Sequence, residues 1–352
     1  MDRYIGMDAH SQTCTFAVMG PSGRRLREQV VETSAKPLVD FLKSVAGDRH
    51  LCFEEGALSE WLYELLEPHT KETLVVQPLR HSGVKNDSRD AWNLANEYRT
   101  GHLKTIVYKA PKRLTALRQA VRGYQSSTQD LVRAKLRTKA VFRSRGLLVD
   151  DGIYKAEERA KWLRKLPAPY RRLAELRVGQ MDVIAEVHAQ AETWFLEEAA
   201  KIDAVKWLST LPGISTVRAA QIVAVIVTPT RFRTKGQFRS YCGFGIVTRS
   251  SSDYVRSPDG RWERHPVQQT RGLNRNRNPT LKAVFTGAAM TVIQQMPDHA
   301  LHKDYQRMLQ SNIKPNLARL TLARRIAVTA WAIWKNKERY DPAKHQRSKI
   351  TP

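Results

Sequence analysis

The sequence has few cysteines, and it lacks both long apolar runs and a recognisable leader segment. Its three cysteines, Cys14, Cys52 and Cys242, lie in separate segments with no paired spacing, which argues against a disulfide framework or a zinc site and favours reduced core residues. Apolar runs such as residues 219–227 are far shorter than the roughly 20 residues that cross a bilayer. The first ten residues hold no apolar stretch of the kind that a secretory signal needs. We therefore expect a cytoplasmic protein with no membrane segment.

Acidic residues are also scarce relative to basic ones. The chain has 59 Lys and Arg against 34 Asp and Glu, a formal net charge of +25 and a pI near 10.2. Such a protein attracts a polyanion, because neutralising phosphates releases condensed counterions. Nucleic acid is therefore the expected partner class. A ribosomal or purely structural nucleic-acid binder would show the same balance, so the charge indicates the substrate class and not catalysis.

Length and hydrophobic patterning predict three parts, residues 1–110, 111–203 and 204–352. The first alternates extended and helical patterns, which predicts a mixed α/β sheet with helices on its faces. Its expected strands are 3–7, 13–19, 25–31, 49–53 and 73–77, and its expected helices are 37–45 and 59–66. The second part has long helical periodicity and is expected to form an antiparallel helical hairpin or coiled coil. The third part is expected to be mainly α, ending in a helix over 318–337.

Basic residues concentrate in two of these parts. Between residues 104 and 145 there are twelve Lys or Arg and one acid, Asp130, a pattern typical either of a helix that follows phosphates or of a solvated helix face. Residues 268–282 are basic, Asn-rich and glycine-bearing, and are expected to form a loop. The candidate phosphate contacts are Arg118, Arg122 and Lys135 in the first region and Arg275 and Arg277 in the second.

Four acids occupy positions where a divalent-metal site could form. Asp8 follows one extended run and Glu54 another, while Asp87 and Asp90, three residues apart, share one face of an expected helix. Mg²⁺ prefers such oxygen ligands, and two ions about 4 Å apart can clamp both oxygens of a phosphodiester displacement. Taken singly, Asp8 could cap a turn, Glu54 could be a surface acid and Asp87 could be a helix N-cap. In this order, a strand Asp, a strand Glu and a helical Asp-x-x-Asp follow the pattern of RuvC-type RNase H-like nucleases.

The choice of glutamate has a neighbouring alternative. Glu54 and Glu55 are adjacent, and a shift of the strand by one residue would exchange their faces. We favour Glu54, because it directly follows the apolar pair Cys52 and Phe53, whereas Glu55 opens a Glu-Gly turn.

A run of serines forms a second candidate site. Residues 241–255, YCGFGIVTRSSSDYV, place Ser250, Ser251 and Ser252 beside Arg249. A hydroxyl near a positive charge suits a nucleophile that attacks phosphorus. Serine runs are usually plain loops, so the composition of this segment alone does not indicate catalysis.

Five segments occur in an order that matches a known family. They are YIGMD, FEEG, KNDSRDAWNLA, LPGI followed by a helix, and Cys-Gly-Phe-Gly leading into three serines. Together they resemble the IS110/IS1111 insertion-sequence transposases, relatives of the Piv DNA invertase, over nearly the whole chain. The resemblance implies a RuvC-like DEDD domain, a helical coiled-coil connector and a C-terminal transposase domain. Aligning the family's glycine with Gly243 places its catalytic serine at Ser251.

The resemblance also implies a mechanism and partners. Members of this family cut and rejoin DNA through a covalent serine–DNA link, guided by a structured bridge RNA from the element's own non-coding end. Mg²⁺ would be held by the four acids, and one subunit's carboxylates would meet another subunit's serine in a homodimer or homotetramer. The expected function is therefore RNA-guided, site-specific DNA recombination. Two alternatives are a RuvC-like metal-dependent endonuclease that uses water, and a non-catalytic nucleic-acid-binding protein.

Overall fold

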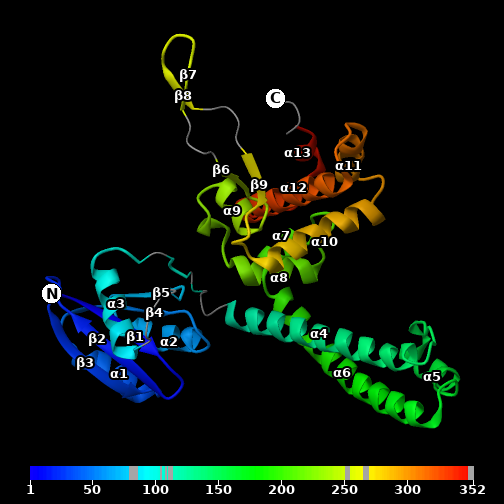
Figure 1. Ribbon diagram of the computed structural model, residues 1–352, viewed down its shortest axis with the longest axis horizontal. Helices are drawn as coiled ribbons and strands as arrows, with labels where there is room; N and C mark the ends of the chain where they lie inside the picture. Colours follow the sequence, from blue (N-terminus) through cyan, green and yellow to red (C-terminus); the bar gives the residue numbers. More distant parts are fainter. Residues whose placement is uncertain are drawn as a thin grey trace. The chain divides into compact units, whose positions relative to one another are not determined.

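The computed structural model describes residues 1–78, 86–103, 105–107, 109, 114–249, 254–264 and 269–347. The chain divides into two compact units, Met1–Lys112 and Arg113–Pro352, and each is described by itself (Figure 1). The division into three parts at residues 110 and 203 stays a prediction.

A five-stranded mixed sheet forms the centre of the first unit. Its strands are β1 Asp2–Ala9, β2 Thr13–Met19, β3 Arg25–Glu32, β4 Asp48–Glu54 and β5 Glu72–Val76. They lie in the order β3-β2-β1-β4-β5, with β2 antiparallel to β1 and β3, and with β4 parallel to β1 and β5. All five expected strands are present within two residues of their predicted bounds, which confirms the mixed α/β sheet.

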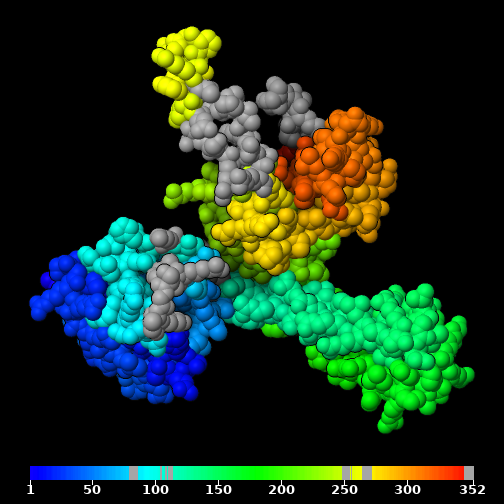
Figure 2. Space-filling view, in the orientation of Figure 1, coloured from blue at the N-terminus to red at the C-terminus, as the bar shows by residue number. Residues whose placement is uncertain are grey.

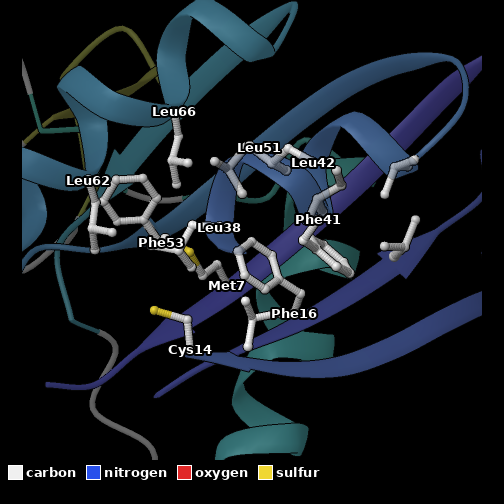
Figure 3. Packing of buried hydrophobic residues seen from close by; sticks show 14 of the residues in the cluster. Met7, Cys14, Phe16, Leu38, Phe41, Leu42, Leu51, Phe53, Leu62 and Leu66 are labelled. Atoms are coloured by element: carbon white, nitrogen blue, oxygen red, sulfur yellow. The ribbon is translucent and has the colours of Figure 1, made fainter. Parts of the chain in front are cut away.

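Helices cover both faces of this sheet. Helices α1 Ala35–Ser44 and α2 Ser59–Leu66, followed by the short η1 Glu67–His69, pack on one face, and α3 Asp87–Arg99 packs on the other. Because side chains alternate along a strand, Met7 and Phe53 point toward α1 and α2. Figure 3 shows Met7 and Phe53 in the same cluster as Phe16 and Phe41. The ring centroids of Phe16 and Phe41 are 4.3 Å apart. The opposite face includes the small residues Ala17 and Cys52 and packs against α3.

The second unit begins with a helical hairpin. Helices α4 Thr115–Arg143 and α6 Ala168–Ala200 are joined through η3 Asp151–Tyr154 and α5 Ala156–Leu163. Tyr124 stacks on Phe195 near one end, and Phe142 packs with Ala174 near the other, so the two long helices run antiparallel. Figure 2 shows the hairpin as an elongated green arm. The expected antiparallel hairpin is therefore present.

The rest of the second unit is mainly helical. Its helices are α7 Asp203–Leu208, α8 Thr216–Ile226, η4 Pro229–Arg231, α9 Lys235–Tyr241, α10 Pro279–Gln295, α11 Ala300–Gln310, α12 Pro315–Asn336 and α13 Pro342–Arg347. Phe238 and Phe285 are buried among them, and Trp331 donates a hydrogen bond of 2.9 Å to the carbonyl of Pro229. The expected helix over 318–337 corresponds to α12, so a helical C-terminal region is confirmed.

Two strand pairs interrupt these helices. Strand β6 Ile246–Arg249 pairs antiparallel with β9 Gln269–Leu273, and β7 Tyr254–Arg256 pairs with β8 Trp262–Arg264. The prediction of a loop over 268–282 is wrong for residues 269–273, which form β9, and for residues 279–282, which form the first turn of α10, while residue 268 lies outside the described residues. The Asn- and Gly-rich surroundings of β9 indicated a loop, but pairing with a distant strand supplies backbone hydrogen bonds that local composition cannot reveal.

Candidate metal site and the serine segment

The register of two parallel strands places Asp8 and Glu54 at the same edge of the sheet. Met7 lies opposite Phe53, so the next residues along β1 and β4 are Asp8 and Glu54. Since Met7 and Phe53 are buried under α1 and α2, alternation turns Asp8 and Glu54 toward the α3 face. Both acids lie at the carboxyl ends of their strands, where a parallel sheet commonly presents functional groups.

Small residues on this face allow α3 to approach the sheet closely. A Cβ atom on Gly6 would lie 2.0 Å from the carbonyl oxygen of Ala91, so no larger residue fits there. On the neighbouring strand, the Cys52 thiol donates a hydrogen bond of 3.2 Å to the carbonyl of Leu94. Because Gly6 and Cys52 each stand two residues before an acid, the packing that anchors α3 also brings its first turn toward Asp8 and Glu54.

The start of α3 supplies the other two acids. Asn86 is the N-cap, and its side-chain oxygen accepts from the backbone N–H of Ser88 at 3.0 Å and of Arg89 at 3.5 Å. The alternative that Asp87 caps this helix is therefore wrong. With the cap provided by Asn86, the carboxylates of Asp87 and Asp90 stand in the first turn without that role.

Three side chains converge at this edge, and one of them was not predicted. His10 Nε2 lies 3.2 Å from Asp8 Oδ2 and 3.4 Å from Asp87 Oδ1. One ligand atom from each of Asp8, His10 and Asp87 lies within 4.8 Å of the others. The sequence signal for His10 is the Asp-x-His spacing at the end of the first strand. Thr33 donates to the carbonyl of His10 at 2.8 Å and holds this turn beside the acids.

Electrostatics in this cluster favour a bound cation. Burial raises the pKa of Asp8, His10 acts against that shift, and the charges of Asp87 and Asp90 raise the pKa further. Both helical acids therefore act on Asp8 by like-charge repulsion, which disfavours its ionised form. A divalent cation among them would relieve this repulsion, and the carboxylate oxygens suit Mg²⁺ or Mn²⁺. The residues present therefore fit a divalent metal site.

The two adjacent glutamates have different surroundings. The Glu55 carboxylate forms an ion pair with Lys109, whose ammonium also donates to the Ser59 hydroxyl at 3.0 Å. Glu54 is the last residue of β4 and turns toward the face that carries Asp8. This arrangement favours Glu54 as the member of the acidic set.

The serine segment lies largely outside the described residues. Ser250, Ser251 and Ser252 are not among them, and of Arg249 only the backbone, at the end of β6, is described. The preceding turn contains Gly243, whose φ of 79° favours glycine. The Arg277 side chain lies directly over it, 2.3 Å from where a Cβ would stand, and donates to the carbonyl of Asn274 at 3.1 Å.

A second cation stands beside Arg277 at this turn. Burial lowers the pKa of Lys282, and the charge of Arg277 lowers it further. The turn that leads into the serines is thus bordered by two positive side chains whose mutual repulsion a phosphate group would relieve.

The remaining basic candidates are placed along the second unit. Arg118 and Arg122 are four residues apart on one face of α4, and Lys135 lies on another side of the same helix. The Lys135 ammonium stands 5.0 Å from the centre of the Tyr154 ring. Arg275 is exposed in the loop between β9 and α10. Among the described residues, no helix is both long and apolar enough to span a bilayer.

Comparison with protein families identifies the chain. Residues 5–145 match the model of the IS110-type DEDD transposases, and residues 205–306 match the model described as transposases of the IS116/IS110/IS902 family. The two matches together cover more than half of the chain. A search of curated proteins finds no match. The first match contains all four acids of the candidate site, and the second contains the serine segment, so the chain is a DNA-binding transposase enzyme that belongs to the IS110 family.

Proposed function

We propose that this transposase cuts and rejoins DNA through a covalent serine–DNA link, using a metal site formed by Asp8, Glu54, Asp87 and Asp90. The observation that carries the proposal is the convergence of Asp8, His10 and Asp87 within 4.8 Å at one edge of the sheet. These residues come from the end of β1, the following turn and the first turn of α3. A structural role would not require two carboxylates to face each other at such an edge, since their repulsion is unfavourable.

The strand order supports an RNase H-like fold of the RuvC type for this domain. Three antiparallel strands, β3, β2 and β1, are followed in space by the parallel strands β4 and β5. The first acid ends the central strand, the second ends its parallel neighbour, and the last two open a helix on the α3 face. The order of acids and elements is therefore the order expected for a DEDD site.

The chemistry divides between the two parts of the site. Bound Mg²⁺ would supply positive charge against the charge that develops on the phosphate oxygens. The four acids hold that charge in place, and His10, within hydrogen-bond distance of Asp8, orients its carboxylate. The Ser251 hydroxyl oxygen forms a bond to phosphorus while the bond to the bridging DNA oxygen breaks, and the serine proton is passed on so that a DNA hydroxyl leaves. The phosphodiester is exchanged and not hydrolysed, so rejoining needs no ATP.

An exposed apolar stripe supports assembly of several subunits. On α6, apolar residues recur at heptad-like spacing and remain open to solvent, with Leu176, Val183 and Val187 exposed by 62%, 61% and 53%. Such a stripe on a hairpin is the seam of a coiled coil that lacks its partner helix. We assign this seam to a second copy of the chain, in a homodimer or homotetramer that brings one subunit's serine to another's acids. The basic residues of α4, among them the exposed Arg122, would contact a structured guide RNA.

Trapping the covalent intermediate tests the proposal. The wild-type enzyme, supercoiled target DNA, guide RNA and Mg²⁺ should yield a protein–DNA adduct on a denaturing gel. Ser251→Ala should lose the adduct and all cutting, whereas Ser250→Ala and Ser252→Ala, the matched controls, should keep both. If Ser251→Ala still cuts DNA while Asp8→Asn does not, the enzyme hydrolyses DNA with water and the serine mechanism is wrong.

Metal binding tests the carboxylate set separately. A calorimetric titration with Mn²⁺ should show weaker metal binding for Asp8→Asn and for Glu54→Gln, since each substitution removes a ligand charge. Glu55→Gln is the control, because its carboxylate pairs with Lys109. Unchanged affinity in Asp8→Asn would refute the metal site. A loss of affinity in Glu55→Gln that Glu54→Gln does not show would make Glu55, and not Glu54, the metal ligand.

A further inference from the structure

Two aromatic side chains are exposed on the short ribbon formed by β7 and β8. Tyr254 is 56% exposed and Trp262 is 68% exposed. Each strand has three residues, and a turn containing Gly260 at a φ of 83° joins them (Figure 1). A two-stranded ribbon of this size is marginal in water, and exposed rings do not stabilise it by burial. Large aromatic side chains held in solvent on so small an element indicate a binding surface.

The pairing register puts both aromatic residues on one face of the ribbon. Tyr254 is opposite Arg264, and Arg256 is opposite Trp262. Opposed residues, and residues two apart along a strand, share a face, so all four of these positions belong to one face. The central pair, of which Glu263 is a member, belongs to the other face. One face therefore combines two aromatic positions with two arginine positions, and none of these four positions holds an acidic residue.

The neighbouring sequence is basic and contains the proposed nucleophile. From Arg249 to Arg277 there are seven arginines and three acids, and β7 begins three residues after Ser251. We propose that the face bearing Tyr254 and Trp262 is a stacking platform for unpaired bases of the DNA strand that Ser251 attacks. Aromatic rings stack on any base, and nearby arginines attract the backbone, so the platform binds without reading sequence. This inference rests on the proposed serine chemistry for the identity of the strand.

Binding measurements with the full chain test this platform. The Ser251→Ala protein serves as background, so that no covalent product forms during the titration. Fluorescence anisotropy would compare a labelled single-stranded DNA, an RNA of the same sequence and a duplex. Trp262→Ala and Tyr254→Ala should each weaken binding of single-stranded DNA about 5- to 150-fold, the range for loss of one stacked base. Trp262→Phe should retain most of the affinity, because a ring remains. Trp61→Ala is the control, since Trp61 is an exposed tryptophan on α2.

Each outcome decides for or against the platform. A loss for single-stranded DNA that greatly exceeds the loss for duplex supports it. Equal losses for single strand and duplex, or unchanged binding in the Trp262→Ala Tyr254→Ala double variant, would overturn it. A loss confined to the RNA would assign the ribbon to the guide and refute the assignment to the DNA strand. The measurement needs no adduct, so a failure of the serine mechanism would appear in the trapping experiment and not here.

Discussion

Replacing Gly6 with alanine tests how the fold carries two acids to the metal site. Gly6 lies in β1, two residues before Asp8, under the backbone of α3. The added Cβ would stand 2.0 Å from the carbonyl oxygen of Ala91 and 2.6 Å from the backbone nitrogen of Ala95. Because both obstacles are backbone atoms, no side chain can rotate away. The helix itself has to retreat by about 1 Å or more to restore ordinary contact distances.

The size of the effect follows from this displacement. Overpacking of this kind costs about 1–3 kcal/mol. For a unit of this length, that loss lowers the melting temperature of the first unit by at least about 4 °C. The helix carries Asp87 and Asp90, so the same retreat separates them from Asp8. A shift of 1 Å in a catalytic group costs roughly 100-fold in rate, which is the loss of adduct formation we expect.

Scanning calorimetry and the adduct assay would measure these two effects together. Gly20→Ala is the matched control, because a Cβ there meets nothing closer than 3.7 Å. The control should melt and react like the wild-type protein. Wild-type stability and activity in Gly6→Ala would show that α3 is not held against β1 as described, and the account of how the acids converge would fail. Normal stability with lost activity would contradict the steric reasoning as well.

Two further predictions concern the helical hairpin. Changing Arg118, Arg122 and Lys135 together to Glu should weaken nucleic-acid binding and reduce the slope of its salt dependence by about one unit per lost phosphate contact. An unchanged slope in a salt titration would show that these residues are part of a solvated surface and contact no phosphates. Changing Leu176 and Val183 to Glu should shift the protein toward monomer in sedimentation experiments without unfolding the hairpin, since both side chains are exposed in the single chain. An unaltered assembly state would exclude this seam as the subunit contact.

Local patterning predicted most of the first unit and the helical hairpin of the second. The strands from β1 to β5 followed from short extended runs, and the hairpin of α4 and α6 followed from helical periodicity, because each pattern repeats within one element. Patterning failed at β9, since its pairing partner β6 lies some twenty residues earlier along the chain. It also left open the alternative that Asp87 caps α3, whereas the adjacent Asn86 provides the cap. At both places hydrogen bonding, and not hydrophobic spacing, determined the local structure.

The residue order alone was sufficient to nominate Asp8, Glu54, Asp87 and Asp90, because strand ends and helix starts can be recognised from nearby residues. The role of His10 became visible only in three dimensions, since its contact with Asp87 spans 77 positions and depends on α3 packing over Gly6. The same packing lets the charges of Asp87 and Asp90 raise the pKa of Asp8, and the register of β4 separates Glu54 from Glu55. Distances between segments far apart along a chain are set by packing, and neither periodicity nor composition carries that information.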